Sequence, residues 1–112
     1  TCVDSDERKC AFIRITGIKL GLSNLKVLNQ RAEDLGSEHF SVFMARGFAS
    51  IEKSLTIVEP LCDVGTRFYH FKSTDWQSEA VAVHQWQNQV LGTYFLTGGE
   101  RVERYIIRSV KN

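Results

Sequence analysis

The sequence predicts an all-β fold, a β-sandwich with at most one or two short helices. Short apolar runs recur at intervals of roughly eight to twelve residues after Ser37, which is the spacing of strands in sandwiches and barrels. Turn residues such as Gly47, Gly65 and Asn88 separate the runs. The runs cover residues 40–44, 55–58, 68–71, 80–83, 93–96 and 105–107.

The first strand is expected over residues 10–20. Ile13 and Ile15 alternate with Arg14 and Thr16 there, as in a strand with one buried face. The alternation changes phase after Gly17, which is typical of a β-bulge.

Residues 22–36 fit two structures. Apolar residues at positions 22, 25, 28, 32 and 35 have helical spacing, with Ser23 as N-cap and Gly36 as the stop. Leu25 and Val27 also fit a strand, which would leave residues 31–34 as a loop. The helix is favoured over residues 29–35.

Strands are predicted for the rest of the chain, and the last two are expected to form a hairpin. Gly98 and Gly99 lie between these two, and a pair of glycines is a tight-turn signal. The predicted strands cover residues 39–45, 54–58, 67–72, 79–86, 92–96 and 102–110.

Length and charge bound the function. A chain of 112 residues without a linker or repeat is expected to be one domain over residues 1–112. The net charge of +1 gives no long-range attraction for phosphate backbones, so no nucleic acid partner is expected. No apolar run approaches the roughly 18 residues of a membrane span. We expect a monomer.

No residue pattern predicts catalysis, a cofactor or a metal. His39, His70 and His84 lie too far apart in sequence for an ordinary zinc site. Neither Cys10 nor Cys62 has the surroundings of a thiol nucleophile. No glycine-rich loop opens a helix, so no phosphate-binding loop is predicted.

The three cysteines suggest passage through an oxidising compartment. The chain begins at Thr1 rather than Met, with Cys2 beside it, which favours a removed signal peptide. Cys2, Cys10 and Cys62 allow three single bridges. A bridge from Cys2 or Cys10 to Cys62 is favoured, and three free thiols are the alternative.

Two surfaces are candidates for binding. Trp76, Trp86 and Tyr94 could stack against a sugar ring, although a place in the core is the commoner role for such residues. The charged hairpin is the candidate partner surface, with a solvated turn as its alternative. It carries Glu100, Arg101, Glu103 and Arg104.

The chain resembles secreted avirulence effectors of cereal rust fungi. The segment TCVDSDERKC at residues 1–10 and the layout of β runs through residues 105–107 carry the resemblance. It implies a β-sandwich of cupin-like or carbohydrate-binding-module-like shape. The His-x-His pair of a metal-binding cupin is missing, so no enzyme activity is expected.

The resemblance also implies a place of action. The effector would be secreted, enter the plant host cell, and act in the host cytoplasm or nucleus on a host target protein. An intracellular immune receptor with leucine-rich repeats would recognise it. Free thiols become favoured in that reducing compartment. The alternative function is a secreted carbohydrate-binding module.

Overall fold

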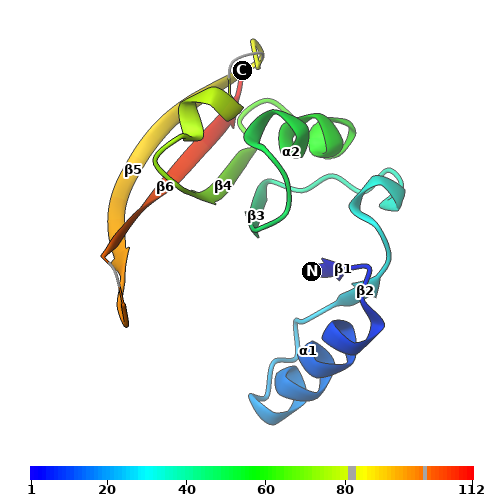
Figure 1. Cartoon of the computed structure of the whole chain (residues 1–112). Coiled ribbons are helices and arrows are strands. Elements are labelled where there is room, and N and C mark those ends of the chain that lie inside the picture. Colours follow the sequence, from blue (N-terminus) through cyan, green and yellow to red (C-terminus); the bar gives the residue numbers. More distant parts are fainter. Residues whose placement is uncertain (81–82, 100) are drawn as a thin grey trace. The chain divides into compact units, whose positions relative to one another are not determined.

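The structure is a computed structural model that describes residues 1–80, 83–99 and 101–112. It contains two compact units, Thr1–Gly36 (unit 1) and Ser37–Asn112 (unit 2), which are described separately (Figure 1). That residues 1–112 form a single domain, as the sequence predicts, stays a prediction. Among the described residues, no helix is long and apolar enough to cross a bilayer.

Unit 1 is a small βαβ unit. Strand β1 (Cys2–Asp4) is parallel to β2 (Val27–Asn29), and Cys2 lies opposite Val27. Helix α1 (Glu7–Lys19) joins the two strands, since parallel neighbours need a crossover connection. The short 3-10 helix η1 (Ala32–Asp34) follows β2.

Local signals explain why α1 is a helix, although a strand was predicted over residues 10–20. The Asp6 side chain caps the helix by accepting from two amides of its first turn. Cys10 and Gly17 are buried seven positions apart, and Ile13 between them is half-buried, as on one face of a helix. Ile15, which alternation would have buried, is exposed.

Gly17 does not form a β-bulge. It lies where α1 closely approaches the segment before β2. A Cβ atom at this position would lie 2.4 Å from Leu25 Cδ2. The favoured helix over residues 29–35 is also wrong, because β2 ends at Asn29 and η1 spans only Ala32–Asp34. The strand-and-loop alternative is the closer description.

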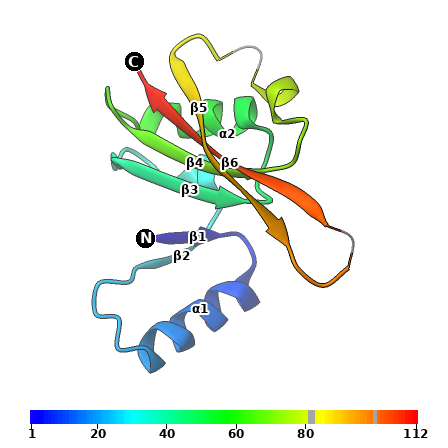
Figure 2. The ribbon, with the colours of Figure 1, turned by 90° about the vertical axis from the view of Figure 1, so that its left-hand side faces the viewer.

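Unit 2 is a four-stranded mixed sheet with helix α2 on one face (Figure 2). The strand order is β3-β4-β6-β5. Strands β3 (Val42–Arg46) and β4 (Arg67–Lys72) are parallel, and α2 (Ile51–Val58) connects them through the 3-10 helix η2 (Glu59–Leu61).

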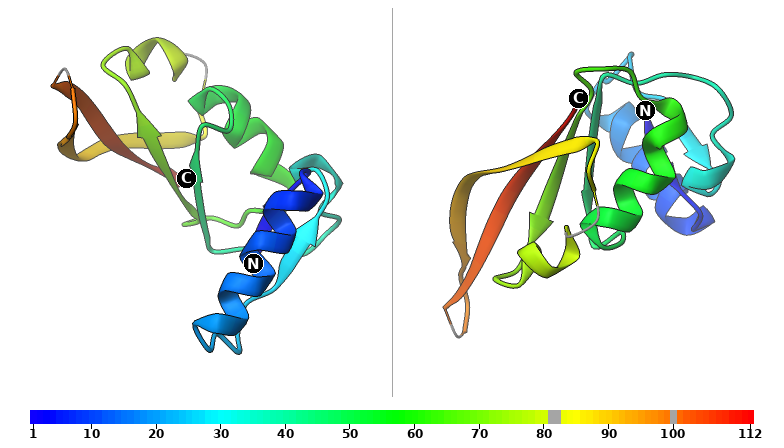
Figure 3. Two further views of the ribbon diagram at one scale, coloured as in Figure 1. Left: turned by 60° about the horizontal axis from the view of Figure 1, so that its bottom comes forward. Right: turned by 90° about the horizontal axis from the view of Figure 1, so that it is seen from above.

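The C-terminal part of unit 2 is a long hairpin. Strand β6 (Val102–Lys111) is antiparallel to both β4 and β5 (Trp86–Leu96). Because the last residue of β4, Lys72, lies opposite Tyr105, the far ends of β5 and β6 extend past β4 as a two-stranded ribbon (Figure 3). The 3-10 helix η3 (Trp76–Glu79) lies between β4 and β5.

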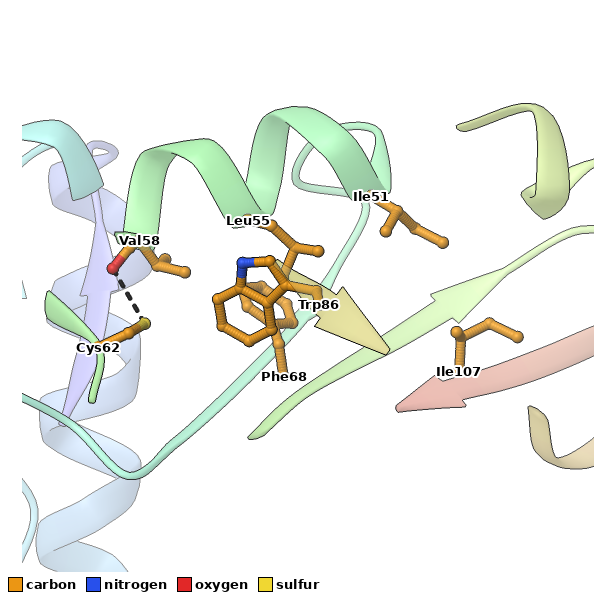
Figure 4. Close-up of a cluster of buried hydrophobic side chains, with 7 residues drawn as sticks. All are labelled: Ile51, Leu55, Val58, Cys62, Phe68, Trp86 and Ile107. Atoms are coloured by element: carbon orange, nitrogen blue, oxygen red, sulfur yellow. Dashed lines mark hydrogen bonds between the residues drawn. The ribbon is translucent and has the colours of Figure 1, made fainter. Parts of the chain in front are cut away.

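Helix α2 builds the core, although residues 54–58 were predicted as a strand. Ser50 caps it by accepting from the Lys53 amide at 3.2 Å. Ile51, Leu55 and Val58 have the spacing of one helical face. They pack on side chains from the sheet and the segment after α2, namely Phe68, Ile107, Trp86 and Cys62 (Figure 4).

The strand predictions hold best at the centre of the sheet. The strands expected at residues 67–72 and 102–110 and a hairpin at Gly98 and Gly99 are confirmed, but the last strand pair is Leu96 with Val102, so the connection is longer than the tight turn expected. The strand expected at 79–86 is wrong where the structure describes it, since Glu79 ends η3 and β5 begins at Trp86; residues 81 and 82 lie outside the described residues. An all-β sandwich is therefore wrong, and the fold is mixed α/β with parallel strand pairs joined by helices.

Candidate functional site

Each unit has one edge at which parallel strands end together. Open α/β sheets bind ligands outside the carboxyl ends of such strands. In unit 1 this edge is formed by Asp4 and Asn29, the last residues of β1 and β2. In unit 2 it is formed by Arg46 and Lys72, the last residues of β3 and β4.

In unit 1 a network of hydrogen bonds fixes the end of β1. The Asp4 carbonyl accepts from the Gln30 amide at 3.1 Å and from Asn29 Nδ2 at 3.2 Å. The buried Cys10 thiol donates to the same carbonyl at 3.3 Å. Asp4 Oδ1 accepts from the Asp6 amide at 2.8 Å. The Asp4 carboxylate is thus held at the strand end, where it can accept hydrogen bonds from hydroxyl groups.

In unit 2 the loop after β3, residues 47–50, presents a cation and an aromatic ring. Arg46 is exposed, and Phe48 is 44% exposed although it is a large apolar residue. Gly47 takes a φ of +64°, a conformation that favours glycine and turns the chain. Ser50 then caps α2.

An ion pair joins this loop to the end of β4. Lys72 Nζ donates to the Ala49 carbonyl at 2.6 Å and lies 2.7 Å from Glu79 Oε2. The same carboxylate oxygen accepts from the Ile51 amide at 3.2 Å. The Lys72 and Glu79 side chains are only 15% and 26% exposed. The loop is therefore tied to two other segments of the same edge.

A buried polar chain crosses the sheet on the face that α2 covers. Ser109 Oγ donates to Asn88 Oδ1, so it accepts from His70 Nε2, 3.1 Å away. The His70 ring stacks on Phe68 with centroids 4.2 Å apart. Burial, assisted by the charge of Lys72, lowers the pKa of His70 to about 3. This imidazole is a neutral core group.

A hollow of about 450 Å³ lies at the opposite edge of unit 2. Leu55, Glu59, His84 and Trp86 are among its lining residues. Trp86 is the first residue of β5 and pairs with Lys111, next to the start of β4. Because this is the amino-terminal end of the parallel strands, the hollow is not at the ligand-binding edge.

The proposed sugar-stacking residues do not form one platform. Trp86 is 6% exposed and donates through Nε1 to Glu59 at 2.9 Å. Trp76 lies in η3 and packs against the same core. Tyr94 pairs with Arg104, and this register places it on the face of the sheet away from α2.

The charged hairpin forms, but its residues are not equally exposed. The Arg101 guanidinium stacks over the Phe95 ring at 3.9 Å from its centroid. Glu103 and Arg104 are half-buried within β6. Glu100 lies outside the described residues.

The cysteines and histidines form neither a bridge nor a metal site. Cys2, Cys10 and Cys62 are all free, so the favoured bridge to Cys62 is absent. Burial raises the pKa of the Cys62 thiol to about 11. No group of three His, Cys, Asp or Glu side chains suited to a metal ion exists within residues 1–80, 83–99 and 101–112.

Sequence reasoning missed the residues of both carboxyl edges. The signal that could have found them is a polar residue directly after a short apolar run and before a helix cap, as in VDSD at residues 3–6 and ARGFAS at residues 45–50. The missed residues are Asp4, Asn29, Arg46, Phe48, Lys72 and Glu79.

The sequence matches a known protein family over most of its length. A sequence model of the GidB family, described as rRNA small subunit methyltransferase G, matches residues 1–106. A protein named ribosomal RNA small subunit methyltransferase G 3 from Bdellovibrio bacteriovorus is 32% identical over 102 residues, which are 87% of this chain and 46% of that protein. A ribosomal RNA small subunit methyltransferase G from Dinoroseobacter shibae is 36% identical over 88 residues, 78% of this chain and 45% of that protein.

Solved structures support the same fold. An rRNA methylase from Streptococcus thermophilus superposes with a TM-score of 0.65 and 13% identity, covering 97% of this chain and 70% of that chain. A putative methyltransferase from Streptococcus mutans, solved in complex with SAH, gives a TM-score of 0.65 at 10% identity and covers 98% and 74% of the two chains. At these identities the likeness concerns the fold, which is the Rossmann-like methyltransferase fold.

These matches overturn the resemblance to rust effectors. The segment at residues 1–10 that carried it lies within the family match and forms β1 and the start of α1. The expectations of an effector, of a carbohydrate-binding module and of a protein that is not an enzyme are wrong, because the family is a family of rRNA methyltransferases. Secretion into a host cell, an immune-receptor partner and the exclusion of nucleic acid are wrong for the same reason.

The relatives are longer than this chain. The chain spans less than half the length of the Bdellovibrio and Dinoroseobacter proteins that it matches. The family match nevertheless extends over residues 1–106 of the 112, which include all of unit 1 and residues 37–106 of unit 2. The chain belongs to the GidB family of rRNA small subunit methyltransferase G proteins.

Proposed function

We propose that the protein takes part in the methylation of small-subunit ribosomal RNA with S-adenosylmethionine as methyl donor. The observation that carries the proposal is the family match over residues 1–106. The two carboxyl edges support it, because each presents side chains whose chemistry suits one of the two reactants.

The carboxyl edge of unit 1 suits the cofactor. In Rossmann-type folds an acidic residue at a strand end binds ribose hydroxyl groups. Asp4 is such a residue, and its position is fixed through Asn29 and Cys10. Asp4 would hold the ribose of S-adenosylmethionine, which supplies an electrophilic methyl group when bound.

The carboxyl edge of unit 2 suits RNA. Single-stranded nucleic acid is bound by cations that contact phosphate and by aromatic rings that stack on bases. Arg46 and Phe48 provide one group of each kind at neighbouring exposed positions. Arg46 would contact a phosphate and Phe48 would stack on a base.

The cofactor role is tested by binding. The purified protein is titrated with S-adenosylhomocysteine in a calorimeter, with Asp4→Asn as the test variant and Asp34→Asn, an exposed residue of η1, as control. Loss of a hydrogen bond to a charged group costs roughly 1.5–3 kcal/mol, so Asp4→Asn should weaken binding about ten- to a hundredfold. Equal affinities in all three proteins would contradict the assignment of Asp4.

The RNA role is tested in the same way. Fluorescence anisotropy with a labelled fragment of small-subunit ribosomal RNA measures the affinity of wild type, Arg46→Gln and the control Arg8→Gln, which alters an exposed residue of α1. Arg46→Gln should weaken binding and lower its salt dependence, because one phosphate contact is lost. A wild-type protein that binds neither this RNA nor S-adenosylhomocysteine would refute the proposed function.

A further inference from the structure

We propose that Lys72 and Glu79 are positioning residues that fix the loop at residues 47–50 in its RNA-contacting conformation. This inference rests on the proposed function. It adds a role for a pair of residues that would themselves touch neither RNA nor cofactor.

The pair connects three segments that are separate in the sequence. Lys72 ends β4, Glu79 ends η3, and the loop at residues 47–50 follows β3. Lys72 Nζ bonds the Ala49 carbonyl at 2.6 Å, and Glu79 Oε2 bonds the Ile51 amide at 3.2 Å. The pair therefore holds the chain on both sides of the α2 N-cap.

The bonds of the Lys72 ammonium explain why it positions the loop and does not bind phosphate. An ammonium has three donors, and two are directed at the Ala49 carbonyl and the Glu79 carboxylate. The Lys72 side chain is also only 15% exposed. The exposed groups at this edge are instead Arg46 and Phe48.

The loop has few other restraints at its centre. Gly47 is free of a Cβ atom and adopts a positive φ, so a wide range of conformations is open to it. The Ala49 carbonyl lies two residues further along the chain and is held by Lys72. Without that bond, Phe48 would sample positions away from a stacked base, and misplacement by about 1 Å can cost up to a hundredfold in a reaction.

Unit 2 contains a matched ion pair at its opposite edge. Lys111 pairs with Glu59, and their side chains are 16% and 34% exposed, close to the values for Lys72 and Glu79. This second pair joins the end of β6 to the C-cap of α2. The two pairs should contribute similarly to folding, but only the first contacts the loop.

The experiment compares wild type with Lys72→Met, Glu79→Gln and the control Lys111→Met. Affinity for the labelled ribosomal RNA fragment, affinity for S-adenosylhomocysteine, melting temperature and amide exchange of Ile51 are measured for each protein. Lys72→Met and Glu79→Gln should weaken RNA binding roughly tenfold, leave cofactor affinity unchanged and speed Ile51 exchange. Lys111→Met should lower the melting temperature by a similar amount and leave RNA affinity unchanged.

Each other outcome overturns the inference in a recognisable way. Equal losses of RNA affinity in Lys72→Met and Lys111→Met would mean that the pair only stabilises the fold. Weaker RNA binding with unchanged Ile51 exchange would mean that Lys72 contacts RNA directly. Unchanged RNA affinity in Lys72→Met would refute positioning while the proposed function stands. A wild type that binds S-adenosylhomocysteine but no RNA would overturn this inference alone, and a wild type that binds neither would remove the proposed function as well.

Discussion

The neutral, buried His70 should make the stability of unit 2 depend on pH in a defined window. Its side chain is 1% exposed and lies in the chain His70–Ser109–Asn88. Its pKa is lowered to about 3 from an ordinary value of 6.5, first by burial and then by the charge of Lys72. In the unfolded chain the imidazole takes up a proton as pH falls below 6.5, while the folded protein excludes that proton.

The sign and size of the effect follow from linkage. Between pH 6.5 and about 3 the unfolded state binds more protons at this site, so the free energy of unfolding rises with pH there and is flat above the window. One pH unit corresponds to roughly 1.4 kcal/mol for a single proton. Lowering the pH from 6.5 to 5 should therefore reduce the free energy of unfolding of the wild type by about 2 kcal/mol through His70.

The assay is urea unfolding at several pH values between 7.5 and 5, followed by tryptophan fluorescence. Trp76 and Trp86 both lie in unit 2, so the signal reports that unit. In the variant His70→Gln the side chain cannot titrate. Whatever the absolute stability of this variant, its free energy of unfolding should lose most of its dependence on pH. His84→Gln, which alters an exposed histidine, should keep the slope. Equal slopes in wild type and His70→Gln would refute the reasoning.

Three further predictions concern local packing, capping and thiol reactivity. Gly17→Ala should displace the Leu25 side chain, because its Cβ would lie 2.4 Å from Leu25 Cδ2. The gain in helix propensity of about 1 kcal/mol offsets part of an overpacking cost of roughly 1–3 kcal/mol, so the melting temperature followed by circular dichroism should fall only slightly. The effect of Gly17→Ala should differ in a Leu25→Ala background, and equal effects in both backgrounds would contradict the close contact. Asp6→Ala should destabilise α1 by about 1 kcal/mol through loss of its cap, measured by chemical denaturation against Asp34→Asn. The Cys62 thiol has its pKa raised to about 11 and should resist Ellman's reagent at pH 8 until urea unfolds unit 2, because the thiolate is the reactive form. Mass spectrometry of labelled peptides measures the reaction of Cys62, and rapid labelling of this residue in the native protein would count against the prediction.

The sheet centre could be predicted from sequence, but the helices were misassigned. Alternation and turn glycines are local signals, so the sequence predicts β4, β6 and the hairpin between β5 and β6. Helix α2 contains Thr56, Ile57 and Val58, which favour strands by intrinsic propensity. Tertiary packing of Ile51, Leu55 and Val58 overrides that preference. The cap at Ser50 was the local evidence for a helix.

The site could not be predicted because it depends on strand direction. Once α2 was assigned as a strand, β3 and β4 had no crossover helix between them, so no parallel pair and no shared carboxyl edge could be inferred. The prediction that excluded a nucleic acid partner rested on net charge and was wrong for a different reason. Cross-strand register places Arg67, Arg104 and Arg108 on the same sheet face, away from α2, and a sum over the chain does not reveal such a distribution.

The ribbon at the end of β5 and β6 should behave as a separate unit of local unfolding. Residues 102–104 of β6, which precede Tyr105, pair with β5 and not with β4, and a two-stranded ribbon is marginally stable by itself. Its amides should exchange at a lower free energy than those beside β4. The turn at Gly98 and Gly99 is then a suitable place for a peptide insertion or a fluorescent label. Both glycines adopt a positive φ that other residues rarely take, so an insertion that keeps them can add new contacts at this tip while the core of unit 2 stays intact.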